Sequence, residues 1–287
     1  MSWRDLYPFE SRFMDVGGQR LHYIEEGAGE PLLFVHGNPT WSFYWRDLIL
    51  GLRDRYRCVA VDHIGCGLSD KPQRYEYTLQ RRISDLVEVV QRLDLRGATL
   101  VAHDWGGAIG LGTVQQLRER FGRIVLFNTG AFPPPFVPWR IAACRIPVFG
   151  TIAMRGVNAF ARAALSMAVE KHERMRADVQ AGLLAPYDSW QNRVAIDAFV
   201  KDIPFSPRHP TWRTLERIEA GLTSLGTMPI QLIWGMRDWC FRPECLERFI
   251  RHWPEAEVQR LEDCGHYVVE DAHERIVPLM RDFLELK

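Results

Sequence analysis

Five short apolar runs, each followed by a polar or glycine residue, constrain the fold of this chain more than any other feature. They span residues 32–35, 57–61, 98–102, 124–127 and 230–234. Short runs that are largely apolar, as these are, are typical of strands that are buried on both faces. Between the runs lie helical patterns, and the clearest of them places apolar residues on one face of residues 83–93. Strands alternating with helices predict an α/β fold with a mostly parallel sheet covered by helices on both faces.

The alternation of strands and helices is interrupted once, in the middle of the chain. Residues 131–138 are rich in proline, which lacks a backbone donor and fixes φ, so they are not expected to form regular structure. Helical patterns broken by further prolines follow, and the strand pattern resumes only near residue 230. We therefore predict a core of residues 1–131 and 223–287 with a helical cap inserted at 132–222. The apolar residues 146–149 are expected to pack inside this cap, and a surface that touches a membrane or a partner is the alternative.

Composition excludes several classes of protein. The chain has 287 residues with 36 basic and 36 acidic side chains, so no nucleic-acid partner is expected. No stretch of 18 apolar residues occurs, and the N-terminal sequence lacks the order of a signal peptide, so we predict no transmembrane segment and a cytoplasmic location. The six cysteines show neither CxxC nor zinc spacing, which predicts free thiols and no metal. No phosphate-binding glycine motif follows a strand, so no organic cofactor is expected.

Polar residues that follow the strands form the candidate site, because ligands of open α/β sheets bind beyond the carboxyl ends of the strands. The segments are residues 36–39, 103–107, 235–238 and 263–266. Residues 102–106 read Ala-His-Asp-Trp-Gly, which is the small-x-nucleophile-x-small pattern of a sharp strand-to-helix turn. Asp104 occupies the position of the usual serine. A single aspartate after a strand commonly caps a helix, but the joint occurrence of the four segments indicates an active site.

The chain order Asp104, Asp238, His266 is the nucleophile-acid-histidine order of a catalytic triad. An aspartate can displace a leaving group from an sp³ carbon and form an ester with it. In hydrolysis, His266 would deprotonate the water that attacks this ester, and Asp238 would orient His266. The backbone N–H of Trp105 and one near Asn38 would hold the oxyanion. We interpret His103 as structural and assign no role to His63.

These motifs together resemble the haloalkane dehalogenase family of the α/β-hydrolase fold, over essentially the whole chain. The matching segments are residues 36–41 (HGNPTW) and 104–107 (DWGG), together with Asp238 and His266. Residues 62–72 (DHIGCGLSDKP) look most like the branch that includes the β-lactone decarboxylases of bacterial long-chain olefin biosynthesis. The resemblance implies that the side-chain N–H groups of Asn38 and Trp105 clamp the leaving group. The family's other acid position falls in residues 128–131, where this chain has no carboxylate.

The resemblance favours decarboxylation of a long-chain cis-β-lactone to an alkene and CO₂. Attack at the ring carbon that bears oxygen and attack at the carbonyl both remain open. The alternative is a haloalkane dehalogenase that hydrolyses a carbon–halogen bond. Epoxide hydrolase is a minor alternative, because it normally uses two cap tyrosines and residues 132–222 contain only Tyr187. A serine esterase is disfavoured by Asp104, and a non-catalytic binding protein by the complete triad.

The substrate is thus expected to be an apolar small molecule, in keeping with the Ala-, Phe-, Leu- and Met-rich part of the cap. Chain length and stereochemistry of the substrate are left open by the sequence, as are a homo-oligomer and an assembly with other enzymes of a pathway.

Overall fold

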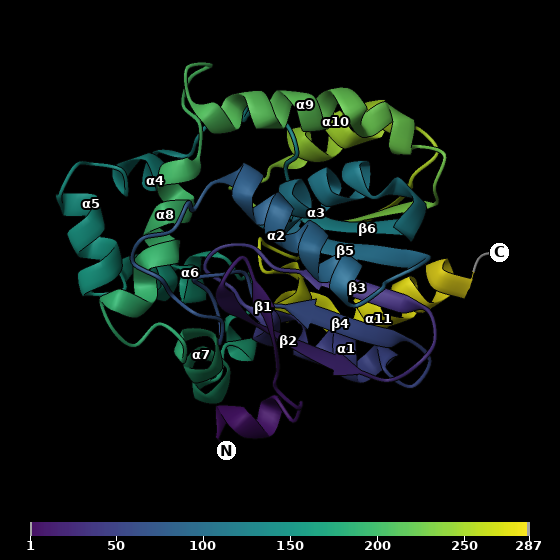
Figure 1. Ribbon diagram of the computed structural model, residues 1–287, viewed down its shortest axis with the longest axis horizontal. Coiled ribbons are helices and arrows are strands. Elements are labelled where there is room, and N and C mark those ends of the chain that lie inside the picture. The colour runs from purple at the N-terminus through teal and green to yellow at the C-terminus, as the bar shows by residue number, and fades with distance from the viewer. Residues whose placement is uncertain (1, 286–287) are drawn as a thin grey trace.

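The computed structural model describes residues 2–285, which contain an eight-stranded sheet flanked by helices (Figure 1). Its strands are β1 (Arg12–Val16), β2 (Gln19–Glu26), β3 (Pro31–Val35), β4 (Arg57–Val61), β5 (Ala98–Asp104), β6 (Phe121–Thr129), β7 (Ile230–Gly235) and β8 (Glu257–Leu261). The spatial order is β1-β2-β4-β3-β5-β6-β7-β8. β2 runs antiparallel to both of its neighbours, and all other pairs are parallel. The predicted α/β class with a mostly parallel sheet is confirmed.

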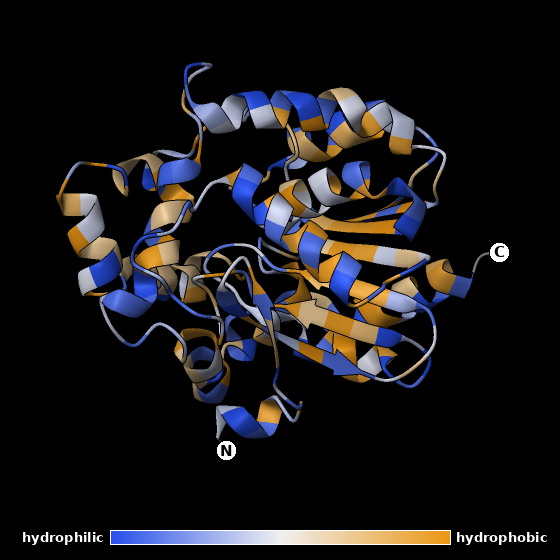
Figure 2. Cartoon of the chain, in the orientation of Figure 1, coloured by the Kyte–Doolittle hydropathy of each residue, from blue (hydrophilic) through white to orange (hydrophobic). Residues whose placement is uncertain are grey.

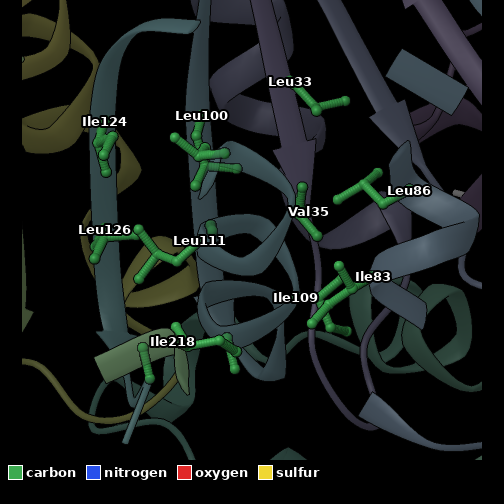
Figure 3. Packing of buried hydrophobic residues seen from close by; sticks show 14 of the residues in the cluster. Leu33, Val35, Ile83, Leu86, Leu100, Ile109, Leu111, Ile124, Leu126 and Ile218 are labelled. Carbon is green, nitrogen blue, oxygen red and sulfur yellow. The ribbon is translucent and has the colours of Figure 1, made fainter. Parts of the chain in front are cut away.

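The central strands are buried on both faces, so alternate side chains enter two separate cores. In β3, Leu33 and Val35 join one core, whereas Leu32 and Phe34 join the other. Figure 3 shows the first core, where side chains of β3, β5 and β6 meet residues from the helices such as Ile83. The sheet helices are α1 (Arg46–Leu52), α2 (Leu79–Arg92), α3 (Trp105–Gln116), α9 (Pro210–Leu225), α10 (Pro243–His252) and α11 (Val268–Glu285). Helices α2, α3, α9 and α10 contribute to the first core, and α1 and α11 to the second.

Helix α2 shows why the sequence pattern folds as it does. The side chain of Thr78 accepts a hydrogen bond from the backbone N–H of Arg81 and so caps the first turn of the helix. The predicted apolar face is buried, with Ile83 and Leu86 each 2% exposed. Figure 2 shows the same division across the molecule, with hydrophobic strands inside and hydrophilic residues on the outer surfaces of helices.

The segment between β6 and α9 forms short helices that lie to one side of the sheet in Figure 1. They are α4 (Trp139–Ala143), α5 (Phe149–Thr151), the π-helical turn η4 (Ile152–Gly156), α6 (Ala159–Met167), α7 (Ala177–Leu184) and α8 (Val194–Asp202). Short 3₁₀ turns complete the chain: η1 (Trp3–Leu6), η2 (Ser42–Trp45), η3 (Arg118–Arg120), η5 (His172–Arg174) and η6 (Gln191–Arg193). Most of helix α9 falls in the predicted cap range of 132–222, but the helix packs on α2 and α3 of the core. We therefore propose that the cap ends before Pro210.

The expectation that residues 146–149 pack inside the cap is wrong. Ile146 is 51% exposed, Val148 73% and Phe149 65%. Helix α5, which begins at Phe149, lies at the outer edge of the molecule in Figure 1. Within the same range, every helix is too short or too polar to cross a membrane.

Candidate active site

Asp104 is the last residue of β5, and α3 begins directly after it. Its φ of 54° and ψ of −130° are strained for a residue with a side chain, and they mark a sharp turn between strand and helix. The turn places Asp104 at the N-terminus of α3, where the helix dipole favours negative charge. The predicted strand-to-helix turn around Asp104 is thus present.

The small residues of the motif are required because this turn is tightly packed. A Cβ on Gly106 would lie 2.1 Å from the carbonyl oxygen of Val35, and one on Gly107 would lie 2.0 Å from Oγ1 of Thr129. The Thr129 hydroxyl in turn donates a hydrogen bond to the carbonyl oxygen of Asp104. The neighbouring strands β3 and β6 therefore fix the position of the aspartate.

Two backbone N–H groups bind the Asp104 carboxylate. The N–H of Asn38 donates to Oδ1 at 2.7 Å, and the N–H of Trp105 also stabilises the charged form. Burial nevertheless raises the pKa of Asp104 above its ordinary value, because these bonds and His266 offset the loss of solvation only in part. The two N–H groups are those expected to form the oxyanion hole. The N–H of Asn38 holds Oδ1, while Oδ2 faces His266.

His266 lies between the two predicted acidic partners. Its Nε2 is 3.6 Å from Oδ2 of Asp104, and its Nδ1 is 2.8 Å from Oδ2 of Asp238. Burial alone would lower the pKa of His266, but the carboxylates of Asp238 and Asp104 outweigh it and raise the pKa above its ordinary value. The fold therefore brings together three residues that the sequence places on separate segments, in a geometry suited to nucleophile, histidine and orienting acid.

Asn128 is a site residue that our sequence reasoning missed. Its Nδ2 donates to Oδ2 of Asp238 at 3.0 Å and to the carbonyl oxygen of Gly235 at 2.9 Å, while its Oδ1 accepts the N–H of Gly235. The N–H of Cys240 binds the other oxygen of Asp238 at 2.6 Å. Residues 128–131 contain no carboxylate, but the amide of Asn128 holds the carboxylate that follows the next strand. A buried asparagine directly at the end of a strand was the available signal.

Asn38 and Trp105 both border the cavity above Asp104. The Nδ2 of Asn38 makes only a long contact of 3.4 Å to the carbonyl oxygen of Ile196, and its buried Oδ1 has no partner among the described residues. Within residues 2–285, the indole N–H of Trp105 also donates to no protein group. The indole N–H of Trp105 is therefore free to bind a ligand beside the nucleophile, and the Asn38 amide is held only by its long bond to Ile196. Their role as a leaving-group clamp remains a prediction.

The cavity has a volume of about 470 Å³ and a predominantly apolar lining. Asp104, His266 and Tyr267 lie at its core side, and the cap contributes side chains such as Phe136, Trp139, Met154, Phe160 and Met167. Trp239 also lines the cavity, and its indole N–H donates a hydrogen bond to the carbonyl oxygen of Met167. This volume lies within the range of small-molecule sites, and the lining suits an apolar ligand.

The remaining histidines near these motifs do not reach the cavity. His103 Nε2 lies 2.9 Å from the carbonyl oxygen of His266, which supports the loop that carries the triad histidine. His63 pairs with His36 instead: its N–H donates to Nε2 of His36, and its own Nε2 lies 3.0 Å from the His36 carbonyl oxygen. Across residues 2–285, no three His, Cys, Asp or Glu side chains cluster as metal ligands, and all six cysteines are free.

Comparisons with known proteins agree with this architecture. Residues 32–279 match the model of the alpha/beta hydrolase family. The chain is 44% identical to a cis-3-alkyl-4-alkyloxetan-2-one decarboxylase of Xanthomonas campestris pv. campestris, over 97% of each chain. A protein of the same name from Shewanella oneidensis is 41% identical, over 97% of this chain and 89% of that one. The solved structure of the haloalkane dehalogenase DatA from Agrobacterium tumefaciens superposes with a TM-score of 0.87 and 26% identity, over 96% of each chain.

The resemblance to haloalkane dehalogenases and their β-lactone decarboxylase branch, inferred from the motifs, is confirmed by these relatives. With a matched family model over most of its length, this chain is an enzyme that belongs to the alpha/beta hydrolase family.

Proposed function

We propose that the enzyme decarboxylates a cis-3,4-dialkyl-oxetan-2-one, a β-lactone, to an alkene and CO₂. The observation that carries this proposal is the carboxylate of Asp104 facing an apolar cavity, with His266 beside it and the neutral donors of Asn38 and Trp105 at the cavity wall. The relatives with 41% and 44% identity are named for this activity, which supports it.

The reaction is accounted for by the side chains of the site. Asp104 Oδ2 attacks the ring carbon that bears oxygen, and the C–O bond of the ring breaks to give an aspartyl ester and a free substrate carboxylate. The carbon–carbon bond to that carboxylate then breaks and releases CO₂. Its electron pair forms the alkene as the bond from carbon to Asp104 breaks, so that the aspartate is regenerated. Attack at the carbonyl is the other route, but it generates an alkoxide that needs a proton.

The route through the ring carbon needs no proton donor, because the leaving group of the first step is a carboxylate. Asn38 Nδ2 and Trp105 Nε1 would hold this carboxylate until it leaves as CO₂, as neutral donors can in a dry cavity. His266, whose pKa is raised, would supply positive charge beside Asp104 and the new carboxylate. Asp238 and Asn128 would hold His266 in place.

Haloalkane hydrolysis is the second candidate, and it is favoured by the same two donors and by the likeness to DatA. In that reaction a halide leaves, and His266 activates water to cleave the aspartyl ester. Epoxide hydrolysis receives less support. Tyr187, the one tyrosine of residues 132–222, donates its hydroxyl to the carbonyl oxygen of Thr40 at 3.2 Å and does not border the cavity.

We further propose that the enzyme works in the cytoplasm, where six free cysteines would stay reduced.

A paired assay on the purified enzyme tests the function. One arm offers a cis-β-lactone with two alkyl chains, and the other a short terminal bromoalkane. The proposal expects alkene and CO₂ from the lactone with slow or no halide release. Rapid halide release with an intact lactone would refute it and establish the dehalogenase. The Asp104→Asn variant should bind the lactone without turnover, whereas full turnover by this variant would exclude Asp104 as nucleophile.

A further inference from the structure

The cap carries an exposed apolar surface at its outer edge. We define the cap tip as Trp139, Ile146, Val148, Phe149, Ile152 and Val157, which are 51–75% exposed. Figure 1 shows α4 and α5, which contribute to it, at the edge of the molecule remote from α11. Large apolar side chains gathered in this way are unusual on a protein surface that meets only water, and they mark an interaction site.

The charge of the same segment is one-sided. Residues 131–169 contain four arginines, Arg140, Arg145, Arg155 and Arg162, and no acidic residue, in a chain whose formal net charge is zero. Among residues 2–285, none of these four forms an ion pair with a carboxylate, although most other arginines do. The cap tip is therefore accompanied by four arginines without a carboxylate at ion-pair distance among the described residues, although Asp202 acts on Arg145 from farther away.

Arginines and apolar side chains meet directly at this surface. The guanidinium of Arg140 lies 5.6 Å from the ring of Trp139, and that of Arg145 lies 4.1 Å from the ring of Phe205. Exposed aromatic and aliphatic tips with basic groups between them fit a lipid surface, where the tips enter the acyl region and the cations bind anionic headgroups.

The cap tip is also continuous with the cavity. Trp139 is 75% exposed and yet lines the cavity, as do Arg140 and Cys144. An alkyl chain of the substrate that is too long for a cavity of about 470 Å³ would extend out of the cavity along this apolar rim. A surface that joins the cavity to the outside in this way can receive an apolar substrate without its passage through water.

We propose that the cap tip docks on the surface of an anionic lipid bilayer and that the cavity takes its apolar substrate from there. The docking stands on the exposure and charge of the cap tip alone. The delivery of substrate rests on the proposed function.

Co-sedimentation with vesicles tests the docking. Vesicles of phosphatidylcholine with phosphatidylglycerol should bind the protein, whereas pure phosphatidylcholine should bind it much less, and high salt should release it. Phe149→Ser should weaken binding about tenfold, because it removes an apolar side chain from the acyl region. Arg145→Gln and Arg155→Gln should each weaken binding about fivefold.

Matched controls lie elsewhere on the surface. Leu50→Ser removes another exposed apolar residue, which is 39% exposed on α1, and Arg251→Gln removes an exposed arginine on α10. Both should bind vesicles like the wild type. Phe149→Ser should keep the melting temperature and its turnover of a short-chain, water-soluble substrate, so that loss of docking is distinguished from failure of the proposed function.

Absence of binding to the anionic vesicles would overturn the proposal, as would equal weakening by Leu50→Ser and Phe149→Ser. Self-association measured by light scattering, lost in Phe149→Ser and without any vesicle binding, would also overturn it and assign the surface to a second copy of the chain.

Discussion

A methyl group added at Gly37 should disable the active site without unfolding the protein. The Cβ of alanine at this position would lie 2.0 Å from Oδ1 of Asp104 and 2.4 Å from its Cβ, whereas ordinary contacts begin at 3.4 Å. The aspartate or the loop of residues 36–39 must therefore move by more than an ångström. The 2.7 Å bond from the N–H of Asn38 to Oδ1 would be lost with this movement.

A displacement of about 1 Å at reacting groups costs about 100-fold in rate, so kcat for the lactone should fall about 100-fold in Gly37→Ala. The overpacking should cost about 1–3 kcal/mol in free energy of unfolding, which leaves the protein folded. Alkene release followed by gas chromatography gives kcat, and a urea titration gives the free energy of unfolding.

Gly156→Ala is the matched control, because its new Cβ would meet nothing closer than 3.8 Å. This variant should keep both kcat and stability. The reasoning would be refuted if Gly37→Ala kept kcat within about threefold of the wild type, or if the two variants lost activity equally.

Three further perturbations address the support of the site and of the fold. Asn128→Leu removes the donor at 3.0 Å from Oδ2 of Asp238, so kcat should fall about tenfold or more and the free energy of unfolding by about 1–3 kcal/mol, and unchanged values would contradict the anchoring role. Asp238→Asn should lower the pKa of His266, which Asp238 helps to raise, and NMR titration of the ring would show it. The raised pKa of His266 stabilises the fold at a pH below the pKa that this histidine has in the unfolded chain, about 6.5. This stabilisation is lost as pH rises through the higher folded-state pKa, so the excess stability of the wild type over Asp238→Asn should shrink as pH rises above about 6.5. Arg46→Met leaves Glu270 buried without its bidentate partner at 2.6 and 2.7 Å and should cost about 3–5 kcal/mol in urea unfolding, whereas Arg96→Met, at an exposed pair, should cost less than about 1 kcal/mol.

The parts of the fold that the sequence predicted are those whose burial leaves a local pattern. β3 and β5 are fully buried strands, so their apolar runs stand out without any knowledge of the neighbouring strands. Strands β1, β2 and β8 lie outside the five apolar runs, and β1 and β2 form an antiparallel pair at one edge of the sheet. β1 (Arg12–Val16) is mostly exposed and carries mixed polar and apolar residues, so its pairing with β2 leaves little trace in composition.

The sequence predicts those residues of the candidate site that directly follow a strand and belong to a recognisable motif. Asp104, Asp238 and His266 were placed in this way, and the distances between them depend on strand order, which no local pattern records. Asn128 was missed because its function is to hold Asp238, and this contact exists only in the folded structure. The exposure of Phe149 was missed for a similar reason, since hydrophobicity indicates a preference for burial but not whether another element covers the residue.

Turnover of the β-lactone in water enriched in ¹⁸O, followed by mass analysis of the peptide that contains Asp104, tests the proposed chemistry most directly. Decarboxylation breaks the bond between substrate carbon and aspartate oxygen, so many turnovers should yield alkene while Asp104 stays unlabelled. Hydrolysis of an aspartyl ester places a water oxygen in the carboxylate. Label in Asp104, together with a hydroxy acid in place of the alkene, would contradict the decarboxylase and show that the site works as a hydrolase.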